Sequence, residues 1–375
     1  MTAAVWLLAN TLSYPAGGGH RWVYLNWALG LRALGCEVRW VERVAPATPL
    51  QALRAYAAAL RRDLTPHGLA GAVVLCADTE QPLAAHLPDG CQSLETAGEA
   101  DLLLNLAYYA PSALVARSRR SAMVDIDPGL TQFWISTGQM RVSRHDLYFT
   151  IGETVGQPGA RFPDCGLTWH YTPPPVFLPA WSVAGARPDA PYTTVTHWWG
   201  EPMEFPGESY YNGKRDGFFA FLDLPQLTPH ALELAIYLGS AEEERRMLQK
   251  RGWRIADPQA VAATARDYRR YVRRSRGEFS CAKPSCLRLQ NAWISDRTLC
   301  YLASGKPAVV QHTGPSRFLP DADGLFRFRS LADAARALSA AESGYERHCR
   351  LARALAEEYF DARKVIGRVV ERALA

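Results

Sequence analysis

Residues 275–314 read SRGEFSCAKPSCLRLQNAWISDRTLCYLASGKPAVVQHTG, and this stretch decides the fold class. It predicts a strand that ends near Glu278, a helix over Asp296–Ala303 and a further strand over Ala308–Gln311. Ser295 stands where a side chain can cap the start of the helix. A strand, a helix and a strand in this order form a β-α-β unit with parallel strands.

The same alternation of apolar runs and helical periods extends through the rest of the chain. In the first half we expect strands over Val5–Ala9, Glu37–Val41, Ala72–Cys76, Leu102–Leu106, Ala122–Ile126 and Leu147–Ile151, and helices near His20–Leu34 and Leu50–Arg62. In the second half we expect strands over Tyr192–Thr196, Glu278–Cys281 and Leu325–Phe328, a helix near Pro229–Leu238, and a mostly helical end over Leu331–Leu374. The pattern predicts two parallel-sheet domains of the Rossmann-like kind.

Between the halves, Thr172–Pro191 contains six prolines. Proline lacks a backbone donor, so this stretch suits neither a helix interior nor a central strand. We therefore predict a first domain over residues 1–171, a linker over 172–191 and a second domain from residue 192. A chain of 375 residues is long enough for two domains of ordinary size.

Composition narrows the classes of protein. The net charge of +5 is too small to demand nucleic acid or an anionic membrane as partner, and we expect neither. No apolar run reaches membrane-spanning length, and the apolar stretch Met1–Asn10 is interpreted as a buried strand instead of a signal peptide. The eight cysteines form no C-x2-C pair, which favours reduced thiols and a cytoplasmic location over a zinc site.

The helix that starts after Ser295 is the strongest candidate for a binding site. Backbone N–H groups at a helix N-terminus attract anions, and Arg297 lies in its first turn, with Lys283 and Arg288 shortly before. Without a metal, amides and cations must neutralise the charge of a leaving diphosphate. Asp296 or Glu278 is a candidate acceptor for ribose hydroxyls. The alternative is an ordinary β-α-β unit with an ion-paired helix start.

A second basic group, Lys214 and Arg215, follows Gly213 near the start of the second domain. Adjacent lysine and arginine side chains can clamp a diphosphate, and arginine can do so with two parallel hydrogen bonds. A solvated surface pair is the alternative.

In the first domain, the glycines Gly17, Gly18 and Gly19 precede His20 between the first strand and its helix. Glycines let a ligand approach the backbone closely, and the imidazole of His20 is a candidate general base for an acceptor. A flexible turn and a surface histidine are the alternatives.

The stretch Asp125–Gly129 follows another predicted strand. Acids at the carboxyl end of a parallel strand lie where such sheets bind ligands, so Asp127 is a candidate to orient or deprotonate the acceptor. An Asp-x-Asp pair also raises metal-dependent sugar transfer, and an Asp-Pro-Gly turn is the structural alternative.

The sequence resembles GT-B glycosyltransferases of group 1, and within them the spore-maturation glycosyltransferase-like proteins. The resemblance is carried by SRGEFSCAK, SDRTLCYLASGKPAVVQHTG, YYNGKRDGFFAFLDLP, VDIDPGLTQ and HDLYFTIGE, which are spread over both domains. Group-1 retaining enzymes usually have two glutamates eight positions apart, where this chain has Ala292 and Cys300. The resemblance leaves retention or inversion of configuration open.

The resemblance implies two Rossmann-like domains that face each other across a cleft. The first would bind the acceptor, residues 192–355 would bind a nucleotide-sugar, and residues 356–375 would form a terminal helix that crosses back. His20 and Asp127 would act on the acceptor. The expected donor-binding residues are Gly18, Gly19, Lys214, Arg215, Glu278, Lys283, Arg288, Ser295, Asp296, Arg297 and Gly314.

We therefore predict a hexosyltransferase that uses no metal and no cofactor beyond its donor substrate. The alternatives are a non-hydrolysing sugar-nucleotide epimerase and a catalytically silent nucleotide-binding subunit.

Overall fold

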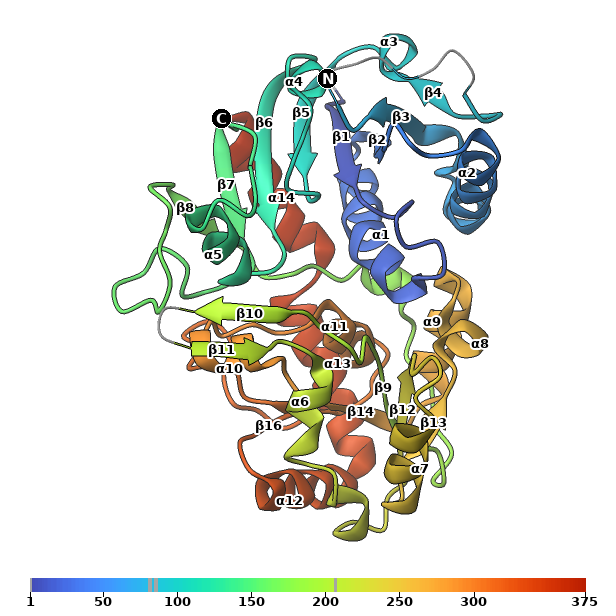
Figure 1. The fold of residues 1–375 in the computed structure, drawn as a ribbon, viewed down its shortest axis with the longest axis vertical. Helices are drawn as coiled ribbons and strands as arrows, with labels where there is room; N and C mark the ends of the chain where they lie inside the picture. Colours follow the sequence, from blue (N-terminus) through green and yellow to red (C-terminus); the bar gives the residue numbers. More distant parts are fainter. Residues whose placement is uncertain (1, 80–82, 84–86, 206–207) are drawn as a thin grey trace.

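The computed structural model describes residues 2–79, 83, 87–205 and 208–375. Within these residues the chain forms two parallel sheets, one above the other in Figure 1. The first has the order β4-β3-β2-β1-β5-β6-β7-β8 and the second β13-β12-β9-β14-β15-β16. The expected α/β class with two parallel-sheet domains is confirmed.

The elements of the upper part are β1 (Ala4–Ala9), α1 (Gly18–Ala33), β2 (Glu37–Val44), α2 (Leu50–Leu64), β3 (Val73–Ala77), β4 (Gln92–Ser93), α3 (Leu94–Ala97), β5 (Ala100–Asn105), α4 (Ser112–Val115), β6 (Ser118–Asp125), α5 (Leu130–Ser136), β7 (Leu147–Thr150) and β8 (Trp169–Tyr171).

The elements of the lower part are β9 (Tyr192–Thr196), the hairpin β10 (Pro202–Phe205) and β11 (Glu208–Tyr211), α6 (Lys214–Phe219), β12 (Leu232–Ile236), α7 (Glu242–Lys250), β13 (Arg254–Ala256), α8 (Pro258–Ala262), α9 (Ala265–Arg274), β14 (Gly277–Ser280), α10 (Pro284–Leu289), α11 (Asp296–Ala303), β15 (Ala308–Gln311), β16 (Leu325–Phe328), α12 (Leu331–Glu342) and α13 (Tyr345–Tyr359). The last helix, α14 (Ala362–Leu374), returns to the upper part.

One predicted element is wrong. The segment Pro229–Leu238, expected to be a helix, contains the strand β12, which pairs in parallel with β9 and β13. The side chains of Leu232, Leu234 and Ile236 are buried on one face of this strand, and Ala235 is buried on the other. A strand covered on both faces has a short continuous apolar run, which periodicity cannot distinguish from a buried helix.

The two crossings between the domains are hydrogen-bonded to each other. Val176 in the proline-rich linker donates its N–H to the carbonyl of Phe360 at 2.8 Å, and its own carbonyl accepts the N–H of Ala362 at 3.0 Å. Phe360 follows the last residue of α13, and α14 begins two residues later. The linker and the return of the chain therefore form one joint.

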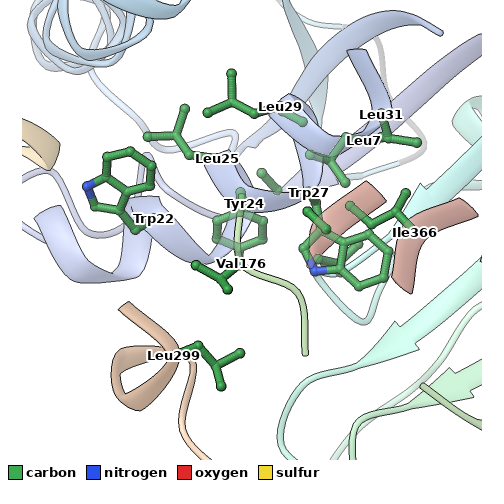
Figure 2. Close-up of a cluster of buried hydrophobic side chains, with 14 of the residues drawn as sticks. Leu7, Trp22, Tyr24, Leu25, Trp27, Leu29, Leu31, Val176, Leu299 and Ile366 are labelled. Atoms are coloured by element: carbon green, nitrogen blue, oxygen red, sulfur yellow. The ribbon is translucent and has the colours of Figure 1, made fainter. Parts of the chain in front are cut away.

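Apolar packing extends from the first domain through this joint into the second. Figure 2 shows Leu25 and Trp27 of α1 in one cluster with Val176 of the linker, Leu299 of α11 and Ile366 of α14. Ile366 lies against Gly30 of α1, where an added Cβ would be 2.4 Å from its Cδ1 atom. The domains therefore share part of their core.

The glycines before α1 are explained by contact between the domains. A Cβ atom on Gly18 would lie 2.2 Å from the carbonyl oxygen of Thr264, and one on Gly19 would lie 2.8 Å from the ring of Tyr268. Trp22 on the same helix donates its indole N–H to the carbonyl of Ala265 at 2.7 Å. The start of α1 thus rests on the start of α9.

No helix in the described part of the chain is long and apolar enough to cross a membrane.

We expect Gly18→Ala to lower the free energy of unfolding by about 1–3 kcal/mol, because the added methyl group forces α1 away from α9. Gly71→Ala is the matched control, since an added Cβ at Gly71 meets nothing within 4 Å. Chemical denaturation of both variants measures the difference. An equal change in the two variants would contradict the close interdomain contact.

Candidate functional site

The loop after β1 is fixed by a buried acid. The carboxylate of Glu42 accepts the backbone N–H of Thr11 at 2.8 Å, that of Leu12 at 3.2 Å and the indole N–H of Trp40 at 2.8 Å. Burial raises the pKa of Glu42, and these hydrogen bonds act in the opposite direction. Glu42 therefore holds the loop that leads to α1.

His20 lies in the first turn of α1, at the carboxyl edge of the first sheet. Its Nε2 atom lies 2.8 Å from the carbonyl oxygen of Asn10. Because a carbonyl oxygen only accepts, Nε2 carries the proton and Nδ1 is left as the acceptor of the neutral ring. Burial lowers the pKa of His20, although the bond to Asn10 and the charge of Asp127 oppose this shift. A neutral imidazole is the form that a general base requires.

The two acids after β6 have different roles. Asp125 is fully buried and accepts hydrogen bonds from Thr131 Oγ1 at 2.6 Å, Gln132 Nε2 at 2.9 Å, Thr150 Oγ1 at 2.8 Å and the N–H of Asp127 at 3.0 Å. Its carboxylate therefore holds the β6–α5 turn in place. Asp127 is half-buried and accepts the hydroxyl of Tyr108.

Tyr108 is a residue of this site that the sequence does not reveal. Its φ of 65° is in the left-handed region, which is unusual for a tyrosine. The side chain of Asn105 holds the turn, because its Nδ2 donates to the carbonyl of Tyr108 at 2.7 Å and its Oδ1 accepts the N–H of Ala107 at 2.9 Å. The strained turn places the hydroxyl on Asp127 at 2.5 Å.

In the second domain, Arg297 in the first turn of α11 is held on three sides. Its guanidinium donates to the carboxylate of Glu278 at 2.7 Å, the carbonyl of Val195 at 3.2 Å and the hydroxyl of Ser280 at 2.5 Å. The side chain of Glu278 is fully buried. Glu278 therefore positions Arg297, and its contact with ribose stays a prediction.

Lys214, at the start of α6, lies beside Arg297 and is 5% exposed. Its ammonium donates to the carbonyl of Cys281 and lies 5.6 Å from the ring centre of Trp293. The close approach needs Gly217, where an added Cβ would be 2.2 Å from the carbonyl oxygen of Ala282. In the described part of the chain no carboxylate forms an ion pair with Lys214. Burial lowers the pKa of Lys214 to about 7, and the charge of Arg297 adds to this shift.

Lys283 joins this group, since its charge also lowers the pKa of Lys214. Lys214 is buried, Lys283 is half-buried, and the buried acid Glu278 pairs with Arg297. Ser295 caps α11 by accepting the N–H of Arg297 at 3.3 Å. These cations lie at the N-terminus of an eight-residue helix, where backbone N–H groups and the helix dipole favour negative charge.

Asp296 of α11 lies near Asp127 of the first domain. Burial raises its pKa to about 7, and the charge of Asp127 contributes to that shift. The two carboxyl groups, one from each domain, are therefore close enough to interact. A carboxyl group with this pKa can donate a hydrogen bond near neutral pH.

Other expected site residues do not join the cation group. Arg215 pairs with Glu244 at 2.7 Å and stacks on Phe219. Arg288 pairs with Glu208 at 3.1 Å and stacks on Tyr210.

The expected glycines of the site are also explained by packing. Gly18 and Gly19 meet α9, as described above. Gly314 lies against Gln290, because an added Cβ would be 2.7 Å from its carbonyl oxygen.

The space beside Arg297 is small in this conformation. The hollow lined by Ser280, Trp293, Ser295 and Arg297 encloses about 30 Å³, the size of one water molecule. The adjoining loop has two residues in the left-handed region, Gln290 with a φ of 50° and Ala292 with a φ of 54°. A nucleotide needs several hundred cubic ångströms. Binding one therefore requires this loop or the domains to move.

No group of three or more acid, histidine or cysteine side chains that could hold a metal ion occurs among the described residues.

The whole fold is shared with solved GT-B glycosyltransferase structures. An alpha-glucosyltransferase (AGT) in complex with UDP has a TM-score of 0.60 and 11% identity, with 100% of both chains covered. HepE from Anabaena in complex with UDP has a TM-score of 0.53 and 12% identity over 98% of this chain and 99% of that one. AviGT4, a glycosyltransferase involved in Avilamycin A biosynthesis, has a TM-score of 0.52 and 13% identity over 99% of this chain and 97% of that one. Neither a family model nor a curated protein matches the sequence. At these identities the likeness establishes the GT-B fold.

We expect Lys214→Met to raise the free energy of unfolding near neutral pH by a few kcal/mol, because it removes a buried ammonium. The pKa of Lys214 lies below its ordinary value of 10.5, so the unfolded chain binds this proton more tightly. The cost to stability is fully present below pH 7 and is lost as the pH rises from about 7 to 10.5.

Denaturation curves at about pH 6.5 and pH 10 measure this effect. The gain from Lys214→Met should be large at the lower pH and small at the higher one. Lys250→Met is the control, because Lys250 is exposed at the end of α7. A gain that does not depend on pH would contradict the buried charge.

Proposed function

We propose that the chain is a glycosyltransferase that moves a sugar from a nucleoside-diphosphate donor to a small-molecule acceptor without a metal ion. The observation that carries the proposal is Lys214, a buried ammonium without an acid partner in the described residues, beside Arg297 and the start of α11. A buried cation is costly unless an anion compensates it. A diphosphate at this position would supply the missing negative charge.

The diphosphate would lie against the N–H groups of α11, between Lys214, Lys283 and Arg297. As the bond from the sugar to the diphosphate breaks, negative charge develops on the leaving oxygen. Preorganised cations stabilise that charge without having to rearrange. Glu278 and Ser280 contribute by holding the guanidinium of Arg297 in one orientation.

We place the acceptor against the first domain, between His20 and Asp127. A neutral His20 or the carboxylate of Asp127 would accept the proton of the acceptor, and in a retaining reaction the leaving phosphate would take it instead. Asp296 faces the same space from the second domain and would hydrogen-bond the sugar or the ribose. Closure of the domains would exclude water and limit donor hydrolysis.

Metal-free transfer is supported by the way the Asp-x-Asp pair is used. Both oxygens of Asp125 already accept hydrogen bonds from the protein, so only Asp127 is left to bind a substrate. Lys214, Lys283 and Arg297 supply the positive charge that a metal would otherwise provide.

The proposal predicts that one nucleoside diphosphate raises the melting temperature, and that EDTA does not change the shift. UDP is the first to test, since it is bound in the structures of HepE and AGT. Lys214→Met should weaken binding about 10- to 150-fold through loss of a charge-assisted contact, although the free variant is more stable. Lys250→Met should bind normally. A shift that appears only with Mn²⁺ would overturn the metal-free mechanism.

The position of Tyr108 predicts a defect confined to catalysis. Tyr108→Phe removes the hydroxyl that orients Asp127, so we expect kcat to fall about 10-fold with the KM for the donor unchanged. Steady-state transfer rates measure both constants, and Tyr56→Phe on α2 is the control. An unchanged kcat, or a rise in KM alone, would exclude Tyr108 as the residue that positions Asp127.

A further inference from the structure

A second hollow, of about 790 Å³, lies between the two domains at the linker. Its walls come from α2 and the turn after it, from α9, and from the linker residues Phe177, Pro179 and Ala180. In Figure 1, α9 lies beside α1 and below α2. The volume falls in the range of pockets that bind small molecules. It shares no lining residue with the hollow beside Arg297.

The charged side chains that line this hollow are mostly arginines. These arginines are Arg62 from α2 and Arg266, Arg269 and Arg270 from α9. Arg62 and Arg266 are exposed, and neither forms an ion pair within the described residues. Arg269 donates to the carbonyl of Ala180 at 3.3 Å, which leaves its charge uncompensated.

The two acids that line the same hollow already have partners within the protein. Asp63 pairs with Arg21 and accepts the N–H of Ala265 at 3.2 Å. Asp267 accepts the hydroxyl of Thr264 at 2.6 Å and pairs with Arg270 at 3.1 Å. Of the four arginines, only Arg270 therefore has an acid partner within the described part of the chain.

The cations Arg266 and Arg269 are close enough to repel one another. Burial lowers the pKa of Arg269, and the charges of Arg273 and Arg266 lower it further. Burial also lowers the pKa of His67, which lines the hollow, and the charge of Arg269 adds to this shift. An anion in the hollow would relieve this repulsion.

We propose that this hollow binds a soluble small molecule that carries at least two phosphate groups. The planar guanidinium group matches phosphate oxygens with two parallel hydrogen bonds, and arginines face the space from both domains. Half-buried Phe177 gives part of the wall an apolar surface for the rest of the molecule. A recess between two domains admits a small ligand more readily than a flat membrane.

Such a ligand would contact the first domain, the second domain and the linker together. It would therefore favour one relative position of the domains. Any effect on the affinity for the donor must be matched by an equal effect of the donor on the affinity for this ligand.

The test is a calorimetric titration with tripolyphosphate of the wild-type chain and two double variants. The first, which we call the groove variant because both positions line the hollow, is Arg62→Gln with Arg266→Gln and removes one unpaired charge from each domain. The control variant, Arg54→Gln with Arg274→Gln, changes exposed arginines on the same two helices that do not line the hollow. The two variants have the same net charge. Binding of tripolyphosphate elsewhere on the protein, including at the donor site, therefore contributes equally to the affinity measured for each.

We expect the groove variant to bind tripolyphosphate at least 10-fold more weakly than wild type, and the control variant within 2-fold of it. Equal losses in the two variants, or no binding by the wild type, would overturn the proposal. So would binding to phosphatidic-acid vesicles without binding to tripolyphosphate. UDP affinity, measured on the same proteins, reports separately on the proposed transferase function.

Discussion

The structure depends on an imbalance of buried charge at the start of α11. Lys214 and Arg297 are held within the second domain; the buried acid Glu278 pairs with Arg297, and Lys214 has no acid partner among the described residues. Desolvation of an ammonium group costs several kcal/mol unless an anion is near, so this arrangement is unfavourable for stability alone. The surrounding strands and helices nevertheless hold these two side chains in place. β9 and β14 supply acceptors for Arg297, and Gly217 lets α6 bring Lys214 against the end of β14.

The first domain differs from the second, because it presents a neutral imidazole and a carboxylate instead of cations. Its buried acids are used to fix loops, Glu42 after β1 and Asp125 after β6. The groups left to meet a substrate are the imidazole of His20 and the carboxylate of Asp127, which Tyr108 orients. In the proposed reaction, the cationic lobe would stabilise a leaving diphosphate, and the lobe that faces it would accept a proton from the acceptor. The shared core around Val176 and α14 joins the two lobes.

The sheets and most helices could be predicted from the sequence, because hydrophobic periods and capping residues are local features of the chain. Strand and helix periods indicated parallel sheets, and Ser295 marked the start of α11. Periodicity failed at Leu232–Ile236, where burial on both faces removes the alternation that marks a strand. Local patterns also could not show that Lys214 points inward while its neighbour Arg215 pairs with Glu244, since both depend on packing.

Contacts between distant residues were hidden for a different reason. The glycines at 18 and 19 looked like a ligand-binding loop, whereas their neighbours are Thr264 and Tyr268, far along the chain. The left-handed turn at Tyr108 has no glycine to mark it and depends on the side chain of Asn105. A single sequence has no local signal for either contact.

Proton uptake on binding UDP tests the central claim most directly. At pH 8 Lys214 is mostly neutral, because burial lowers its pKa to about 7. A diphosphate beside it would raise that pKa, so binding should take up close to one proton. Titration calorimetry in buffers of different ionisation enthalpy measures this number, and Lys214→Met should abolish the uptake. Binding without proton uptake, or an equal uptake in the variant, would contradict the account.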